Sequence, residues 1–356
     1  MQPPTNAETV IVLGAGATKA FLPDAPLAVD DYNLNGLKER FEHFPHVRTL
    51  LELEGARHQN GRIDIEQLMT RLHGRMPYDS DDDMSQQAHL LSEITKEFIN
   101  RIRRAKEGQF YKNDLSVFGR KCVNDRITCI TFNYDDVLDQ ALWEIETEYT
   151  PTIRTTLRDP YWHPDGGYGF FVPSSNSTVN PGSVYMDKAS TLLIKLHGSI
   201  NWYPRKGERA PYGLDTIYHH EDWYPPKWPA LPMGDPELVM RHLEPHPFFI
   251  PPVLDKTSLA GEPILQLVWS LAKKCLSNAS RVYFVGYSMP VTDLAARFLF
   301  KESLDGHSEV IHVVNFAKCE QEKAHIRSAY RTVFKELKDD QFEFDGALKW
   351  GQQFTV

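Results

Sequence analysis

Cysteine is scarce in this chain of 356 residues, and its few cysteines form no motif. The four thiols, at Cys122, Cys129, Cys275 and Cys319, are scattered and include no C-x-x-C pair. Such spacing disfavours a disulfide framework and a cysteine-bound zinc site, and it is typical of core thiols in a reducing compartment. We therefore expect a cytoplasmic protein without a bound metal.

The sequence also lacks long apolar runs and an excess of basic residues. No apolar stretch approaches the ~18–20 residues that a membrane-spanning helix needs. The first residues, MQPPTNAETV, show no basic region followed by an apolar stretch, so we expect no signal peptide. The net charge of −9 disfavours general binding to nucleic acid backbones. Neither a membrane nor direct nucleic acid binding is expected.

What the sequence does contain is a set of five short apolar runs, each of which ends in polar or glycine-rich residues. The runs are Val10–Leu13, Ile127–Phe132, Leu192–Leu196, Val282–Val285 and Val310–Val314. Near-continuous apolar runs predict strands that are buried on both faces, as in parallel sheets. Ligands of open parallel sheets bind beyond the carboxyl ends of the strands. The sequence therefore predicts a Rossmann-like α/β fold, a parallel sheet flanked by helices, with one shared site.

The length fits one large domain or two smaller ones, and we expect one domain over residues 1–356, with segments inserted between the strands. Hydrophobic residues (41%) and charged residues (24%) occur at the levels of folded proteins. Residues 30–125 are patterned as helices and exceed the length of a simple crossover, so they predict an inserted helical subdomain. Within it, the acidic run Asp79–Asp83 is interpreted as a solvated loop. Two loop-rich insertions, the second rich in proline and aromatic residues, and a C-terminal helix with a short tail are expected at about 150–190, 203–252 and 321–356.

Helical spacing is clearest on both sides of the fourth apolar run. Pro263 stands where the first turn of a helix favours proline, and Thr292 or Asp293 fits as the cap of a second helix. The apolar positions of the first helix follow i, i+3, i+4 spacing, at Ile264, Leu265, Val268, Leu271, Ala272, Cys275 and Leu276. Both helices are expected to cover the sheet.

The first apolar run leads into a glycine-rich segment, Gly14-Ala15-Gly16-Ala17-Thr18. Glycines let the backbone approach a diphosphate closely, and the amides at a helix N-terminus attract its charge. Lys19 occupies the place of the third glycine of the dinucleotide fingerprint. Taken alone, the segment fits either a phosphate-binding loop or a tight strand–helix turn without a ligand.

Taken together and in order, the motifs resemble the sirtuin superfamily, specifically the SIR2-like domains of bacterial NAD-consuming anti-phage defence proteins. Gly14–Thr18 is similar to the Gly-Ala-Gly-x-Ser loop, and Thr131–Asp135 to the Thr-Gln-Asn-x-Asp segment that lines the nicotinamide pocket. Lys195–Ser199 resembles the segment with the catalytic histidine. Gly286–Ser288 looks like the turn that holds ribose and phosphate, and Asn315 like the asparagine beside the adenosine ribose. The resemblance spans about residues 8–320.

Further features fit the SIR2-like branch, and one departure from the lysine deacylases is informative. The features are Asp64–Leu68, Asn201-Trp202, Pro251-Pro252 and Met289–Asp293. The deacylases carry a four-cysteine zinc module that helps form the acyl-lysine channel, and this chain has no such cysteines. Members without the module are typically NAD glycohydrolases. The resemblance therefore implies NAD as the substrate, nicotinamide and ADP-ribose as the products, and no metal.

The resemblance assigns catalysis to Asn133, His197 and Asp135. Asn133 is expected to position water and ribose, Asp135 to accept a hydrogen bond from the carboxamide, and His197 to act as a general base, because imidazole titrates near neutral pH. His197 also fits a structural residue at a strand end, and Asp135 also fits the cap of a helix that begins at Asp136. The expected NAD-binding residues are Gly14, Ala15, Gly16, Thr18, Gly286, Ser288, Asp293 and Asn315.

An unregulated NAD hydrolase would kill its own cell, so the resemblance also implies control. We expect self-association and a regulatory protein in trans, such as a DNA-translocase ATPase or a short Argonaute. Two other functions are open. A non-catalytic module that senses NAD or ADP-ribose would need the glycine-rich loop and Ser288 but not His197 or Asn133. A protein deacylase is disfavoured by the missing zinc module.

Overall fold

The computed structural model describes residues 8–25, 39–57, 65–107, 112–149, 162–164, 166–170, 172, 191–208, 216–220, 243–244, 246–250 and 261–354. The chain divides into two compact units. The first, here called the sheet unit, comprises Met1–Pro23, Gln109–Phe249 and Ser258–Val356. The second, the helical unit, comprises Asp24–Gly108 and Ile250–Thr257.

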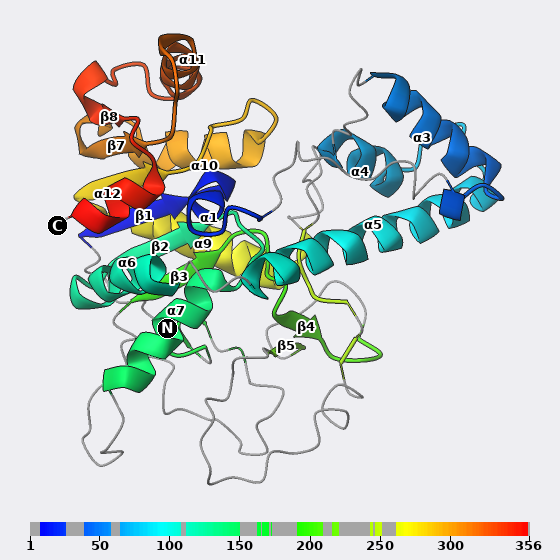
Figure 1. The fold of residues 1–356 in the computed structure, drawn as a ribbon, viewed down its shortest axis with the longest axis horizontal. Coiled ribbons are helices and arrows are strands. Elements are labelled where there is room, and N and C mark those ends of the chain that lie inside the picture. The colour runs from blue at the N-terminus through cyan, green and yellow to red at the C-terminus, as the bar shows by residue number, and fades with distance from the viewer. Residues whose placement is uncertain are drawn as a thin grey trace, which may run out of the picture. The chain divides into compact units, whose positions relative to one another are not determined.

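The sheet unit is built on one six-stranded sheet in which every neighbouring pair is parallel (Figure 1). Its order is β3-β2-β1-β6-β7-β8, so the chain moves outward from β1 in both directions. The strands are β1 (Thr9–Leu13), β2 (Thr128–Thr131), β3 (Leu192–Lys195), β6 (Arg281–Val285), β7 (Ile311–Val314) and β8 (Phe342–Glu343). The predicted Rossmann-like α/β fold is confirmed, and all five apolar runs form strands.

The strands in the half of the sheet from β1 to β3 are buried along their whole length, which explains their near-continuous apolar sequence. Every residue of β1, β2 and β3 is buried. Both faces of such a strand lie against helices, so alternation of polar and apolar residues is absent. The point where the strand order reverses lies between β1 and β6, and this is where sheets of this kind bind ligands.

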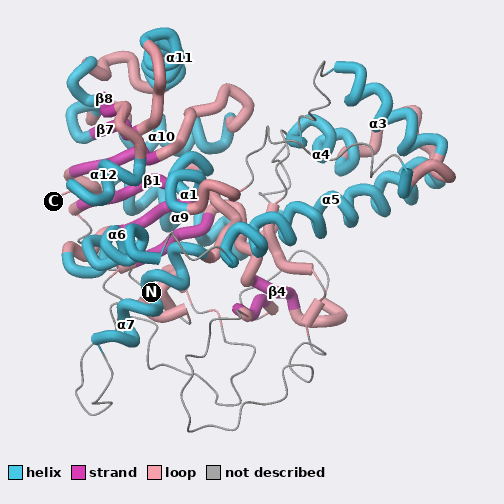
Figure 2. The backbone as a smooth tube through the Cα atoms, in the orientation of Figure 1, coloured by secondary structure: helices cyan, strands magenta, loops and turns pink. Residues whose placement is uncertain are grey.

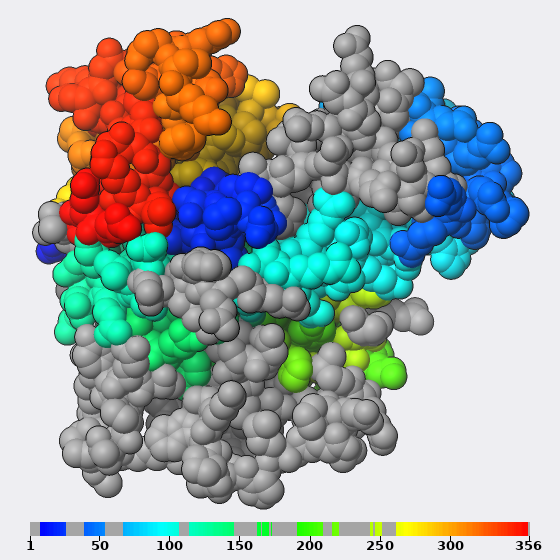
Figure 3. Space-filling view, viewed as in Figure 1, coloured from blue at the N-terminus to red at the C-terminus, as the bar shows by residue number. Residues whose placement is uncertain are grey.

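Helices pack on the two faces of the sheet (Figure 2). One set of helices is joined by contacts of α1 with α12, α12 with α6, and α6 with α7. In another set, α9 contacts α10. Figure 3 shows α1 and α12 side by side on the face in view. Their bounds are α1 (Ala15–Phe21), α6 (Lys112–Asn124), α7 (Val137–Tyr149), α9 (Pro263–Ser277), α10 (Leu294–Leu304), α11 (Glu320–Arg331) and α12 (Ala347–Gln353). Short 3-10 turns occur at Ser308–Val310 and Asp339–Gln341.

The two helices predicted beside β6 are confirmed in detail. Pro263 opens α9, and the buried residues of this helix are the seven apolar positions that the spacing predicted. Asp293 is the N-cap of α10, where its carboxylate accepts a hydrogen bond from the amide of Ala296 at 3.3 Å. The C-terminal segment contains α11 as expected, and it continues into β8 and α12.

The helical unit contains α3 (Pro45–Arg57), α4 (Ile65–His73) and α5 (Asp81–Glu107). The interpretation of Asp79–Asp83 as a solvated loop is wrong. Asp79 is buried, and Asp81, Asp82 and Asp83 form the first turn of α5, where carboxylates interact favourably with the helix dipole. Ser80 and Asp83 exchange side-chain and main-chain hydrogen bonds in the manner of a capping box.

The rest of the chain adds little regular structure to the described part. A small antiparallel pair joins β4 (Trp202–Pro204) to β5 (Ile217–His219). Most of the loop-rich insertions expected at about 150–190 and 203–252, together with Asp64 and the Pro251-Pro252 pair, lies outside the described residues. Where the structure describes the chain, no helix combines the length and the apolar character needed to cross a membrane.

Candidate functional site

The carboxyl ends of the parallel strands gather the predicted site residues at one edge of the sheet. Gly14 follows β1, Asn133 follows β2, His197 follows β3, Gly286 follows β6 and Asn315 follows β7. Parallel strands all end at the same edge, so this placement is a direct consequence of the topology. Motifs that are far apart in the sequence therefore lie at the same edge of the sheet.

The turns after β1 and β6 are packed against each other by their backbones. The amide of Gly14 donates to the carbonyl oxygen of Val285 at 3.0 Å, and that of Gly16 donates to Gly286 at 2.9 Å. A Cβ atom on Gly14 would lie 2.6 Å from the carbonyl oxygen of Gly286. Close backbone packing therefore explains these glycines without a ligand, which was one of the two interpretations of the loop. Ala15 is exposed at the start of α1.

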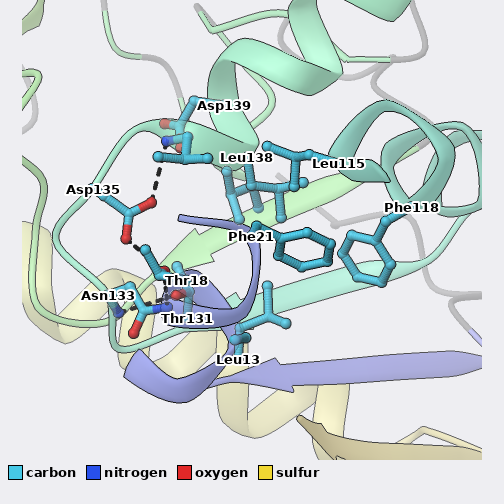
Figure 4. Close-up of a pocket in the computed structure, with 13 residues that line it drawn as sticks. Leu13, Thr18, Phe21, Leu115, Phe118, Thr131, Asn133, Asp135, Leu138 and Asp139 are labelled. Carbon is cyan, nitrogen blue, oxygen red and sulfur yellow. Dashed lines mark hydrogen bonds between the residues drawn. The ribbon is translucent and has the colours of Figure 1, made fainter. Parts of the chain in front are cut away.

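Thr18, Asn133 and Asp135 form a continuous hydrogen-bonded chain (Figure 4). The Nδ2 group of Asn133 donates to Thr18 Oγ1 at 2.8 Å and to the carbonyl oxygen of Gly14 at 2.9 Å. The Thr18 hydroxyl in turn donates to Asp135 Oδ2 at 2.8 Å. Both donors of the Asn133 amide are thus committed, and its Oδ1 atom is the acceptor with which it can bind a further group.

The hydrogen-bonded residues Thr18, Asn133 and Asp135 line one side of a pocket, and the other side is apolar (Figure 4). The pocket holds about 400 Å³ of space, including the part that opens to solvent. Its polar residues are Thr18, Thr131, Asn133, Asp135 and Asp139. Its apolar residues come from β1, α1, α6, α7 and β3, and they are Leu13, Ala17, Phe21, Leu115, Phe118, Val137, Leu138 and Leu193. An apolar wall with a few convergent polar groups is typical of small-molecule sites.

The carboxyl group of Asp135 has a perturbed acidity. Burial raises the pKa of Asp135 above its ordinary value, because an ionised group loses hydration inside a protein. The Lys195 ammonium, the Thr18 hydroxyl and the Val137 amide oppose this rise in pKa by stabilising the ionised form. Asp135 Oδ1 accepts from the Val137 amide at 3.2 Å, so Asp135 satisfies an amide at the start of α7, although this helix begins at Val137 and not at Asp136. Perturbed carboxyl groups beside pockets are typical of functional sites.

A buried ion pair that the sequence analysis missed lies beside Asp135. Lys195 and Asp139 are joined at 3.0 Å, and their side chains are 0% and 1% exposed. Lys195 Nζ also donates to the carbonyl oxygen of Asp135 at 2.6 Å. The other carboxylate oxygen of Asp139 accepts from the Tyr168 hydroxyl at 2.6 Å, to which Asn201 donates at 3.0 Å. The available signal was a lysine at the end of a buried strand, where an unpaired charge is rarely tolerated.

His197 lies next to the same segment but within a group of aromatic rings. It is 4% exposed, with its ring centroid 5.2 Å from Phe132 and 5.9 Å from Tyr134, the two residues that flank Asn133. The ring of Trp269 is 6.3 Å away, and its Nε1 donates to the carbonyl oxygen of Leu196 at 2.8 Å. His197 thus packs against the residues on either side of Asn133, and it is not among the residues that line the pocket.

The residues predicted for the adenosine side have structural contacts around Tyr287. Asn315 is buried, and its Nδ2 donates to the carbonyl oxygen of Tyr287 at 2.9 Å. Asp293 caps α10 and accepts from the Tyr287 hydroxyl at 3.4 Å. Ser288 is exposed. The Tyr287 ring stacks on Phe132 at 4.8 Å, which links this turn to the turn after β2.

Within the described part of the chain, no group of three or more histidine, cysteine, aspartate or glutamate side chains is arranged to hold a metal ion. No protein-family model matches the chain, and no curated protein matches it. Solved structures give weak likenesses at low sequence identity. One is a mutant Sir2 homologue in complex with 2'-O-acetyl ADP ribose, with 13% identity, a TM-score of 0.43, and coverage of 98% of this chain and 91% of that chain.

Two further solved structures were found at a similar level. One concerns the structural basis of sirtuin substrate affinity, with 15% identity, a TM-score of 0.42, and coverage of 97% of this chain and 91% of that one. The other is Sir2 with a p53 peptide and NAD+, with 14% identity, a TM-score of 0.35, and coverage of 92% of both chains. Such low scores say nothing about activity, so function has to be inferred from the residues of the site.

Proposed function

We propose that this protein is a SIR2-like NAD+ glycohydrolase, which cleaves the nicotinamide–ribose bond and releases nicotinamide and ADP-ribose. The observation that carries the proposal is the hydrogen-bonded chain of Asn133, Thr18 and Asp135, which lines a pocket at the carboxyl edge of a parallel sheet. The motif resemblance predicted that these residues act on one ligand, although Thr18 is more than a hundred positions from the other two in sequence.

The chemistry suits a site of this composition. Nicotinamide leaves NAD+ as a neutral molecule from a cationic pyridinium, so the reaction needs no acid at the leaving group, unlike ordinary glycoside cleavage. Water adds to the ribose carbon as the carbon–nitrogen bond breaks, and the water gives up one proton. The site must therefore orient the carboxamide, the ribose and one water.

Three side chains are proposed for these tasks. Asn133 Oδ1 accepts from the attacking water or a ribose hydroxyl, because its Nδ2 hydrogens are held by Gly14 and Thr18. The Asp135 carboxylate accepts from the carboxamide N–H group. The imidazole of His197 takes the proton from the water or the ribose hydroxyl, a contribution of typically about 10²–10⁴ in rate.

The rest of the NAD molecule is assigned to the neighbouring strand ends. The proposed contacts run from the glycine-rich turn, with Thr18, across to the turn after β6, where Ser288 is exposed. Asp293 and Asn315 support this second turn through Tyr287. The full proposed set is Gly14, Ala15, Gly16, Thr18, Gly286, Ser288, Asp293 and Asn315, and it requires no metal.

The biological role follows the motif resemblance. We propose an effector that depletes NAD during phage infection, in the cytoplasm, and that is held inactive until a signal arrives. Self-association and a regulatory protein in trans, of the DNA-translocase ATPase or short Argonaute type, would supply this control. A non-catalytic sensor of NAD or ADP-ribose would use the same pocket but would release no nicotinamide.

The decisive experiment follows free nicotinamide after the purified protein is mixed with NAD+, alone and with a candidate activating protein. The His197→Ala and Asn133→Ala variants are expected to lose about 10²–10⁴ of the rate while retaining NAD binding in calorimetry. The matched controls His307→Ala and Asn278→Ala replace an exposed histidine and the C-cap asparagine of α9. Unchanged turnover in both site variants would defeat the assignment, and binding without nicotinamide release by the activated native protein would favour the sensor.

A further inference from the structure

Lys195 makes a second hydrogen bond besides its buried ion pair with Asp139. Lys195 Nζ binds the Asp139 carboxylate, and it also donates to the main-chain oxygen of Asp135 at 2.6 Å. This second bond is the shorter of the two, and it connects the end of β3 to the segment that follows β2.

The segment Asn133–Asp135 is also held by other main-chain contacts. The Asn133 amide donates to Thr131 Oγ1 at 3.0 Å, and the carbonyl oxygen of Tyr134 accepts from the Ile200 amide at 2.9 Å. The side chains of Asn133 and Asp135 both turn toward Thr18. The direction in which they face depends both on these side-chain bonds and on the main chain between β2 and α7.

We propose that Lys195 is a positioning residue of the pocket: by anchoring the carbonyl oxygen of Asp135, it fixes the main-chain conformation that presents the Asn133 amide and the Asp135 carboxylate to the ligand. Asp139 holds the lysine in place from the first turn of α7. The Tyr168 hydroxyl donates to the second oxygen of Asp139, and Asn201 in turn donates to this hydroxyl.

The charges in this region support the assignment. The charged groups that act on Asp135 are Lys195 on β3 and Asp139 on α7, and they have opposite signs. Lys195 lowers the pKa of Asp135 and Asp139 raises it, while burial raises it most. The lysine thus favours an ionised Asp135 and fixes its location at the same time. For the reaction this inference rests on the proposed function, whereas its effect on the segment does not.

The experiment removes both charges together so that neither is left buried alone. The Lys195→Met, Asp139→Leu double variant replaces the pair with apolar side chains of similar size, a change that proteins often tolerate. Lys121→Met is the matched control. Lys121 bonds to the carbonyl oxygens of Gly351, Gln352 and Phe354 from the last turn of α6, which leads to the amino end of β2 and hence to the opposite edge of the sheet.

The first measurement needs no activity. Amide hydrogen exchange, followed by mass spectrometry, is compared for the peptide that covers residues 132–138. In the double variant we expect exchange there to rise about tenfold or more while the melting temperature stays close to that of the native protein, because an anchor has been lost locally. The control is expected to leave this peptide unchanged. A fall in melting temperature with native exchange in this peptide would overturn the proposal.

The second measurement is the kinetics of NAD+ cleavage by the activated protein. We expect kcat to fall about 10²-fold, as misplacement by roughly an ångström can cause, and the acidic limb of the pH profile to move upward. If the native protein cleaves no NAD, the proposed function fails and the exchange measurement still decides this inference. If the double variant does not fold, Lys195→Gln with Asp139→Asn replaces it, with a smaller expected rise in exchange. Native exchange in that folded variant would equally overturn the proposal.

Discussion

The half-buried Asp135 of the sheet unit and the buried Asp79 of the helical unit both have shifted pKa values, and the two shifts have opposite signs. Asp79 in the helical unit accepts from both terminal nitrogens of Arg71, at 2.7 and 3.0 Å, and from the Met76 amide at 2.8 Å. These bonds hold its pKa well below the usual range. Asp135 in the sheet unit has weaker support, and burial raises its pKa.

This difference in pKa and in hydrogen bonding distinguishes a structural carboxylate, Asp79, from a carboxylate that is suited to bind a ligand, Asp135. The carboxylate of Asp79 accepts hydrogen bonds from Arg71 and Met76. Its ionised form therefore stabilises the fold and has little remaining capacity to bind another molecule. Asp135 lines a pocket, and Lys195, the cation that lowers its pKa, donates a hydrogen bond to its main-chain oxygen. A site that must interact with a ligand gives up some stability for this purpose.

The largest expected effect is a loss of stability, and it is tested by replacing one glycine in each unit. Gly286 has a φ of +62°, and a Cβ atom there would overlap the backbone nitrogen of Ala17. Backbone strain of this kind costs about 1–3 kcal/mol, and the overlap adds to it, so Gly286→Ala should leave little folded protein. Circular dichroism during thermal melting measures the effect.

Gly74 in the helical unit provides the comparison. A Cβ atom there would lie 3.3 Å from the carbonyl oxygen of Thr70, and the backbone has no positive φ. We expect Gly74→Ala to change the free energy of unfolding by less than about 1 kcal/mol. If both variants melted like the native protein, the close packing of the β1 and β6 turns would not exist in solution.

The second effect concerns activity. Asp135→Asn is expected to lower the rate of NAD+ cleavage about ten- to hundredfold, equivalent to ~1.5–3 kcal/mol, because a hydrogen bond to a charged acceptor is lost. Asp79→Asn removes a structural carboxylate, so the rate per folded molecule should match that of the native protein. Nicotinamide release, normalised to the folded fraction, makes the comparison. Equal losses in both variants would mean that Asp135 has no special role.

The sequence was sufficient to predict the frame of the fold. Short, near-continuous apolar runs such as Val10–Leu13 indicated buried parallel strands, and helical spacing placed α9 to within a residue. β8 was missed because it has two residues and its sequence, Phe342–Glu343, shows no run. The start of α5 was also missed, although Ser80 followed three positions later by Asp83 was a recognisable capping signal.

Residues of the candidate site could be predicted only where they belong to a recognisable sequence motif. The resemblance placed Thr18, Asn133 and Asp135 in one set, and they are in contact. No pattern could pair Lys195 with Asp139, because the two are 56 positions apart and the pairing depends on how α7 lies against β3. Such contacts between distant elements follow from tertiary packing, on which periodicity carries no information.

The smallest effect is a difference in how stability depends on pH. The folded state raises the pKa of Asp135, so it binds the proton more tightly than the unfolded chain does. The contribution of this group to stability is therefore present at low pH and is lost as the pH rises through the folded pKa. For Asp79 the sign is opposite, because its lowered pKa gives a contribution that is present at high pH and is lost on acidification.

Melting temperatures measured from roughly pH 8 to roughly pH 2 test these signs, because the contribution of a carboxylate with a lowered pKa is lost only between about pH 5 and about pH 1. Relative to the native protein, Asp135→Asn should become more stable as the pH rises, whereas Asp79→Asn should become less stable. The two difference curves should therefore slope in opposite directions, even if the loss of other contacts shifts either curve as a whole. Parallel curves would show that the two carboxylates have the same environment, and the distinction between a structural and a ligand-binding aspartate would then fail.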